Sequence, residues 1–169
     1  MTADQPRVRD ATAADLPAMS HMAAELVRYH HAVDPQRFFL ARGVEEGYRG
    51  WFTRELEQRG VVLLVAELPT EPEPIGYCYG RLEGRDWNLL LDRHVALHDV
   101  FVREHARRAG VAERLVRTFL DRASALGAPR IVLSTASANA SAQALFAKLG
   151  FRATMIEMTR ECAPGHGSE

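Results

Sequence analysis

Three arginines come shortly before a glycine in the middle of the chain, and this combination of residues suggests that the segment binds an anion. Arg103, Arg107 and Arg108 lie shortly before Gly110. Segment 95–102 is apolar and β-branched enough for a buried strand, and the apolar residues after the glycine recur at helical spacing. A helix N-terminus offers unpaired N–H groups to an anion, and glycine lets a ligand approach the backbone closely. The sequence therefore predicts a polyphosphate site in this loop.

The loop also resembles a short signature of a known enzyme family. Residues 107–112, Arg-Arg-Ala-Gly-Val-Ala, are similar to the Arg/Gln-x-x-Gly-x-Gly/Ala signature of the GNAT superfamily of acetyl-CoA-dependent N-acetyltransferases. Residues 139–151, which begin with Asn and end in Leu-Gly-Phe, look like the family's later motif. The two motifs occur in the family's order, and the resemblance covers about residues 7–159.

Hydrophobic periodicity and turn residues predict the elements that position these motifs. The expected strands are 7–11, 61–68, 75–82, 94–102, 131–134 and 151–159, and the expected helices are 12–31, 44–58, 111–126 and one that follows Asn139. Together with the resemblance, this order implies a single-domain α/β GNAT-like fold over residues 1–162. Its central sheet is expected to be mixed, mostly antiparallel and of six to seven strands, with helices on both faces. A flexible tail is expected at 163–169.

The composition excludes several classes of protein. The 169 residues fit one domain, and 21 basic against 22 acidic residues give a formal net charge of -1, so no bulk attraction to nucleic acid is expected. The two cysteines, Cys78 and Cys162, have no pairing or metal-ligand pattern, which favours a reducing compartment. We find no signal peptide and no apolar run long enough to span a bilayer, so a cytoplasmic protein without a membrane partner is expected.

Amine acetylation needs a base, because an alkyl ammonium with a pKa near ~10.4 cannot attack at neutral pH. His98 is the leading candidate, since it lies on the central strand just before the cofactor-binding residues and an imidazole titrates near the working pH. Some relatives have a Glu-Asp pair where this chain has His98 and Asp99. In a regular strand Asp99 faces the other side and would at most orient the base, whereas a bulge would make it the base itself. Purely structural hydrogen bonds remain the alternative for both residues.

The resemblance also implies the cofactor contacts. Pantetheine is expected along the backbone of the strand, the pyrophosphate on the amides of the loop, and further contacts on the last helix, where Asn139 also caps the helix and Lys148 either reaches a ribose phosphate or lies on a solvated face. The expected cofactor-binding residues are Val100, Phe101, Val102, Arg107, Arg108, Ala109, Gly110, Val111, Ala112, Asn139, Phe146 and Lys148.

Phe146 departs from the family pattern. Many members have a tyrosine at this position, and its hydroxyl is taken to protonate the departing thiolate, which phenylalanine cannot do. A thiol pKa of about 8.5 makes the thiolate a tolerable leaving group, so the loss should slow catalysis without abolishing it. Ser141, Tyr77 and Tyr79 are possible substitutes, although helix capping and core packing explain them equally well.

The amine acceptor is expected to enter on the side of the first two helices. Its predicted contacts are Tyr29, Asp34, Phe38 and Tyr79, which combine apolar walls with a carboxylate that attracts a cation. The adjacent pair His30 and His31 does not predict a metal site, because neighbouring helical residues point in different directions and no second ligand cluster exists.

These features predict an N-acetyltransferase that transfers an acetyl group from acetyl-CoA to a primary amine of a small molecule or peptide by direct attack. The alternative, favoured by Phe146, is a non-catalytic acyl-CoA-binding regulator. An ATP or dinucleotide site is disfavoured, because the chain has neither a Walker loop nor the Gly-x-Gly-x-x-Gly fingerprint. The resemblance also makes a homodimer possible.

Overall fold

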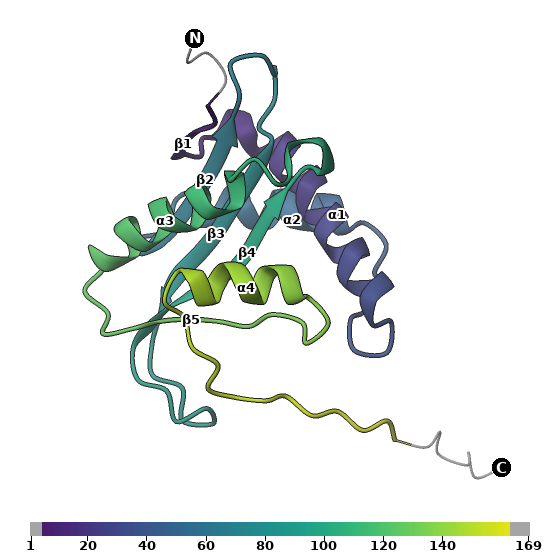
Figure 1. The fold of residues 1–169 in the computed structure, drawn as a ribbon, viewed down its shortest axis with the longest axis vertical. Helices are drawn as coiled ribbons and strands as arrows, with labels where there is room; N and C mark the ends of the chain where they lie inside the picture. Colours follow the sequence, from purple (N-terminus) through teal and green to yellow (C-terminus); the bar gives the residue numbers. More distant parts are fainter. Residues whose placement is uncertain (1–4, 163–169) are drawn as a thin grey trace, which may run out of the picture.

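The computed structural model of the protein describes residues 5–162 as one sheet covered by helices (Figure 1). The strands are β1 Arg7–Asp10, β2 Val61–Glu67, β3 Gly76–Glu83, β4 His94–Val102 and β5 Ile131–Leu133. The helices are α1 Leu16–Val33, α2 Val44–Glu55, α3 Val111–Ser124 and α4 Ala140–Lys148, with short 3₁₀ turns at Ala13–Asp15 and Glu104–Ala106. The tail expected at 163–169 lies outside the described residues.

The strands pair in sequence order, from β1 at one edge to β5 at the other. The first three pairings are antiparallel and the pairing of β4 with β5 is parallel, so the expected mixed, mostly antiparallel sheet is confirmed. The parallel pairing joins only Val95, Ala96 and Leu97 to β5. Within the described part of the chain, β4 therefore continues past Leu97 with no partner strand on its outer side.

Helices cover both faces of the sheet, as the sequence predicts. One core lies under α1 and α2, where Met19, Met22 and Phe52 pack on Tyr77 and Tyr79 of β3. A second core lies on the opposite face; its residues on α3 and α4 include Val111, Leu115, Val116, Phe119 and Phe146. Because the side chains of a strand alternate between faces, each central strand contributes to both cores.

The expected strand at 151–159 is wrong for this structure, which has five strands among residues 5–162 and not six or seven. Beyond Gly150 the chain is extended and exposed, and the side chains of Met155, Ile156 and Met158 are 81 to 89% exposed. Glu157 forms an ion pair with Arg37, in the connection between α1 and α2. An apolar segment forms a strand only when a sheet edge pairs with it, and no strand among the described residues pairs with 151–159.

A β-bulge interrupts the pairing of β3 with β4. Tyr79 is paired with Asp99 but the next residue, Gly80, is paired with Leu97, so His98 is the extra residue on β4. A Cβ on Gly80 would lie 2.3 Å from the carbonyl oxygen of Ala96 and 2.5 Å from the ring of Phe119 on α3. Only glycine lets the two strands and α3 come this close, so Gly80 and the bulge belong to one arrangement.

We expect the substitution Gly80→Ala to destabilise the fold by roughly 2 kcal/mol or more, because a methyl group would overlap both the β4 backbone and the Phe119 ring. Gly84→Ala is the matched control, since a Cβ there meets no atom within 4 Å. Urea unfolding of both variants measures the difference. Equal stabilities would show that the bulge does not depend on Gly80.

Candidate active site

The loop between β4 and α3 has the geometry of an anion site. Arg108 and Gly110 both have positive φ angles, 65° and 77°, and α3 begins at Val111 directly after them. Because the first amides of a helix have no intrahelical acceptor, the amides of residues 108–112 are available to a ligand, and none of them has a protein acceptor within the range 5–162. The positive end of the α3 dipole adds to their attraction for an anion.

Two of the three arginines hold the loop in place. Arg103 donates from Nε to the carbonyl of Pro74 at 3.1 Å and from Nη2 to Glu73 at 3.0 Å. Arg107 donates from Nε to the carbonyl of Val102 at 3.0 Å, and its guanidinium lies 5.7 Å from the centroid of the Phe101 ring. Arg108 is exposed, so its charge is accessible to a phosphate.

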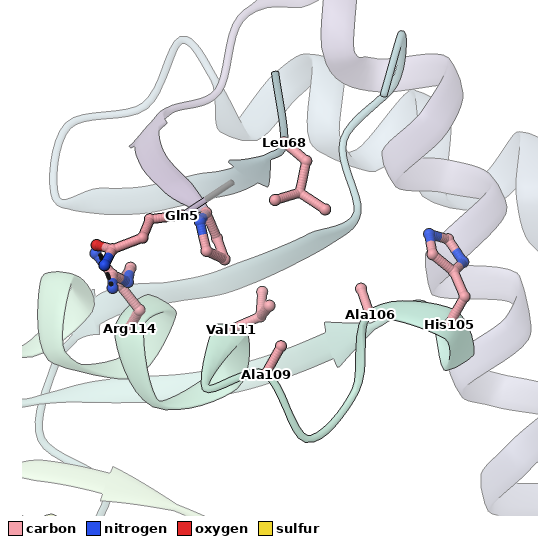
Figure 2. Close-up of a pocket in the computed structure, with 8 residues that line it drawn as sticks. Gln5, Leu68, His105, Ala106, Ala109, Val111 and Arg114 are labelled. Carbon is pink, nitrogen blue, oxygen red and sulfur yellow. Dashed lines mark hydrogen bonds between the residues drawn. The ribbon is translucent and has the colours of Figure 1, made fainter. Parts of the chain in front are cut away.

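A cavity of about 370 Å³ adjoins the loop on the β1 side (Figure 2). Its walls come from the loop, the start of α3, the residues before β1 and the end of β2. The lining residues are Gln5, Pro6, Leu68, His105, Ala106, Ala109, Val111 and Arg114. The unpaired outer edge of β4 faces the β5 side of the sheet, opposite to β1.

The outer edge of β4 is unpaired over the second half of the strand. From residue 98 to Val102 it has no partner strand among the described residues, so its outward N–H and C=O groups are available to an amide-containing ligand, except the Val102 carbonyl, which accepts from Arg107. Val100 and Val102 face the α3 and α4 core, whereas Phe101 faces the α1 and α2 core. The free edge of the strand therefore runs toward the loop amides.

The predicted site residues at helix α4 have structural partners. The Asn139 side chain accepts a hydrogen bond from the Ala142 amide at 3.1 Å, and the Ser141 hydroxyl donates to Asn139 Oδ1 at 3.1 Å. Lys148 Nζ lies 2.6 Å from Glu113 Oε2 of α3. These contacts support the capping interpretation of Asn139 and Ser141 and hold α4 against α3.

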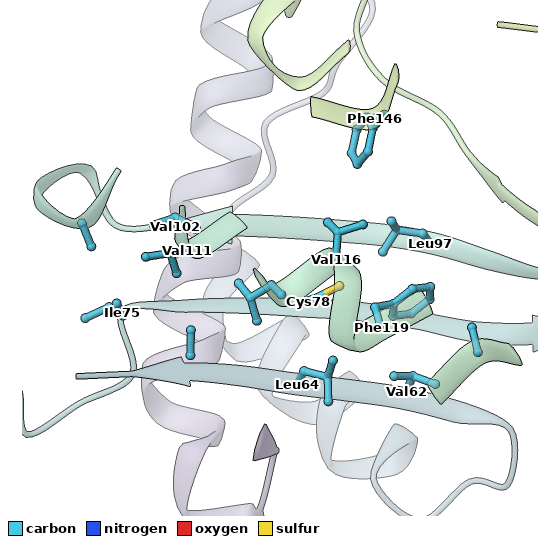
Figure 3. Packing of buried hydrophobic residues seen from close by; sticks show 14 of the residues in the cluster. Val62, Leu64, Ile75, Cys78, Leu97, Val102, Val111, Val116, Phe119 and Phe146 are labelled. Carbon is cyan, nitrogen blue, oxygen red and sulfur yellow. The ribbon is translucent and has the colours of Figure 1, made fainter. Parts of the chain in front are cut away.

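Phe146 is 9% exposed and points from α4 toward β4, where it joins the core that contains Leu97 (Figure 3). Its ring packs edge-on against Phe151 at 5.7 Å between centroids. The ring therefore packs against β4 and has no group that could donate a proton.

The bulge brings His98 and Asp99 to the same face of the sheet. The Tyr77 hydroxyl donates to Asp99 Oδ2 at 3.1 Å, and the His98 ring stacks on the Tyr79 ring at 5.4 Å between centroids. Both tyrosines belong to the α1 and α2 core. Asp99 therefore does not face away from His98, as it would in a regular strand, and the two side chains lie together on the α1 and α2 side of the sheet.

Asp99 lies in a poorly solvated environment. Burial raises the pKa of Asp99 to about 6, against smaller lowering effects of the Tyr77 hydroxyl and of the nearby His98 charge. Burial and the Asp99 charge in turn raise the pKa of Tyr48 to about 12. A partly buried carboxylate with one hydroxyl donor attracts a cationic ligand, because the positive charge offsets the cost of burying the negative charge.

The tyrosine hydroxyls considered as proton donors have other partners. Tyr77 donates to Asp99, and Tyr79 donates to Glu55 Oε2 at 2.7 Å. Arg81 donates to the same Glu55 carboxylate at 3.0 and 3.1 Å. Burial raises the pKa of both Tyr77 and Tyr79, so neither is a ready acid.

The predicted acceptor residues form two separate groups. Tyr79 lies beside His98, as described, whereas Tyr29, Asp34 and Phe38 lie at the connection between α1 and α2. There the His30 ring lies between Tyr29 and Phe38, with centroids 5.6 and 4.9 Å away. Asp34 Oδ1 accepts from the amides of Gln36 and Arg37 and so closes the turn after α1.

The comparisons with known proteins identify the family. The sequence matches the acetyltransferase (GNAT) family over residues 22–151. The chain belongs to this family. The match spans β4, the loop and α4, the elements that build the candidate site.

Named relatives of this GNAT protein are acetyltransferases. An L-methionine sulfoximine/L-methionine sulfone acetyltransferase of Pseudomonas aeruginosa is 32% identical over 148 residues, which cover 85% of this chain and 78% of that protein. The human N-acetyltransferase 8 is 35% identical over 99 residues, which cover 59% of this chain but only 42% of that protein. A solved aminoglycoside N-acetyltransferase in complex with CoA has the same fold, with a TM-score of 0.71, 16% identity, and coverage of 94% of this chain and 95% of that one.

Three further residues of this GNAT protein surround His98 and Tyr79 but are not apparent from the sequence: Glu55, Arg81 and Glu83. Glu55 is 6% exposed, and a carboxylate inside an expected helix gives no sign that it will be buried.

Among residues 5–162 no cluster of three or more metal-ligating side chains is found. No helix in that range is long and apolar enough to cross a membrane.

We expect Asp99→Asn to stabilise this GNAT protein at pH 8 by roughly 1–3 kcal/mol. The raised pKa means that the folded state binds the Asp99 proton more tightly than the unfolded state, so wild-type stability falls as the pH rises from about 4 to about 6. Asparagine has no charge to bury and avoids this loss. The advantage of the variant should therefore vanish near pH 4.

Urea unfolding of both proteins between pH 4 and pH 8 measures this effect. Asp121→Asn, on the exposed side of α3, is the control and should change little at either pH. An Asp99→Asn variant no more stable than wild type at pH 8 would contradict the burial of a charged Asp99.

Proposed function

We propose that this GNAT protein transfers the acetyl group of acetyl-CoA to a primary amine that enters from the α1 and α2 side. The proposal rests on one observation, which is that β4 connects all parts of the candidate site. The same strand holds His98 and Asp99 on one face, exposes its outer edge beyond Leu97, and leads into the loop whose amides are free for a pyrophosphate.

Each part of the site has a role in this transfer. Acetyl-CoA supplies the acyl group as a reactive thioester. The Asp99 carboxylate attracts the ammonium of the acceptor, and His98, whose side chain is 40% exposed, takes its proton. The freed nitrogen attacks the acetyl carbonyl carbon, so a C–N bond forms as the C–S bond breaks. The attacking nitrogen gives up its second proton, the departing thiolate takes up one proton from water, and the products are the N-acetyl amide and the CoA thiol.

The sulfur leaves without a tyrosine acid in this proposal. Phe146 has no hydroxyl, and the hydroxyls of Ser141, Tyr77 and Tyr79 donate elsewhere. A thiolate leaves tolerably well without protonation, so this supports a slower enzyme rather than a non-catalytic regulator. The family match and the acetyltransferase relatives favour the enzyme over that alternative.

The acceptor class follows the relatives. The Pseudomonas relative is named for L-methionine sulfoximine and L-methionine sulfone, which are small molecules with a primary amine. The accessible His98 and the partly buried Asp99 suit such an amine. We therefore propose a small-molecule amine as acceptor, with a peptide amine as the second choice.

We expect the protein to release CoA thiol from acetyl-CoA when an acceptor is present. The panel is L-methionine sulfoximine, L-methionine sulfone, an aminoglycoside, glucosamine 6-phosphate and a peptide. His98→Ala should lower kcat by about 100-fold or more, which is the size of a typical general-base contribution. His21→Ala, a remote histidine of α1 that pairs with glutamates, should keep the wild-type kcat.

Mass spectrometry of the acceptor should show one added acetyl group. Thiol release that is independent of every amine, or a His98→Ala variant as fast as wild type, would contradict the proposed roles. Binding of acetyl-CoA with no transfer to any acceptor would favour the regulator.

A further inference from the structure

Glu83, at the end of β3, is a residue to which the proposed function gives no role. Its Oε1 lies 2.9 Å from His98 Nε2. The Glu83 side chain is 36% exposed and that of His98 is 40% exposed. A carboxylate accepts hydrogen bonds and donates none when ionised, so this contact requires a proton on His98 Nε2.

The position of that proton decides which nitrogen of His98 can act as a base. A neutral imidazole has one N–H nitrogen and one nitrogen with a free lone pair. If Nε2 holds the proton that is donated to Glu83, then Nδ1 holds the lone pair. Glu83 thus fixes both the tautomer and the direction of the basic nitrogen.

Among the residues that the structure describes, the other oxygen of Glu83 has no hydrogen-bond donor as good as His98. Oε2 lies 3.6 Å from Nε2 of His94, which is the residue paired with Glu83 across the two strands. The His94 side chain is 6% exposed, and its Nδ1 donates to the carbonyl of Asp92 at 3.0 Å. Since Nδ1 of His94 holds a proton, its Nε2 has a lone pair when the ring is neutral and pairs with Glu83 only when the ring is charged, so the 2.9 Å contact with His98 is the stronger one.

A second set of contacts fixes the plane of the His98 ring. The ring stacks on Tyr79 with an interplanar angle of 23°. The Tyr79 hydroxyl is anchored on the buried Glu55, and Trp51 and Phe52 pack edge-on against its ring. His98 is therefore constrained both by a ring face and by a carboxylate, although its side chain is accessible to an acceptor.

We propose that Glu83 is a positioning residue that holds His98 as the Nε2–H tautomer and so makes Nδ1 the proton acceptor for the amine. This inference rests on the proposed function, in which His98 is the base. Glu83 acts only through His98, as the carboxylates that orient catalytic histidines do.

Two substitutions of Glu83 test the proposal by kinetics. Glu83→Ala removes the acceptor of the hydrogen bond and should lower kcat by about 10-fold or more, with the acceptor KM within about twofold of wild type. Glu83→Gln keeps an oxygen that accepts from Nε2–H and should recover most of the lost rate. Glu25→Ala removes a carboxylate from another exposed histidine, His21, and should match wild type.

A nitrogen-15 spectrum of the imidazole rings tests the tautomer without relying on activity. His98 is assigned by the signal that disappears in His98→Asn. We expect the neutral His98 to be the Nε2–H form in wild type and in Glu83→Gln, and to become a mixture in Glu83→Ala.

The outcomes separate the two claims. A protein that transfers acetyl groups normally but loses no kcat in Glu83→Ala, or whose wild-type His98 is the Nδ1–H form, overturns the positioning role alone. A loss in Glu83→Ala that glutamine does not restore also overturns it. If wild type transfers no acetyl group to any amine, the proposed function fails, and the positioning role fails with it.

Discussion

The close approach of β3, β4 and α3 at Gly80 is the constraint on which the arrangement of the site depends. There is no room for a side chain at position 80, and at this point the pairing of β3 with β4 includes one extra residue on β4, His98. A regular strand would place His98 and Asp99 on opposite faces. The bulge places both on the α1 and α2 side, so a packing requirement on one face of the sheet determines which polar groups lie together on the other.

The second determinant is the short pairing of β4 with β5. Three residue pairs join the two strands, and beyond Leu97 the outer edge of β4 is available while the strand continues toward the loop. Strand edges are normally covered because their unpaired backbone groups attract other strands. Here the edge leads to the free amides at the start of α3. One extended ligand with an anionic end can therefore form hydrogen bonds both with the strand edge and with these amides.

Local sequence signals were enough to predict the loop and most of the elements. The pattern from Arg107 to Ala112 marks a strand, a loop and a helix N-terminus that lie within one short stretch, and the capping Asn139 marks the next helix in the same way. The alternation of strands and helices also predicted the mixed sheet with helices on both faces. These features depend on residues that are neighbours in the chain.

The remaining features depend on contacts between distant residues. Nothing near His98 in the sequence shows that Glu83 meets it, because that contact follows from the register of β3 with β4 and from the bulge. Glu55 becomes buried only because Tyr79 and Arg81 reach it from another element. The prediction of a strand at 151–159 was wrong for the same reason, since the residues of the segment do not show whether a sheet edge is free to pair with it.

A crystal structure with bound acetyl-CoA is the most direct test of this account. We expect the diphosphate on the amides of residues 108–112, and the pantetheine arm along β4 beyond Leu97, with the acetyl group beside His98 and Asp99. Density for the cofactor in the cavity lined by Gln5 and Leu68, with β4 and the loop amides uncontacted, would contradict it.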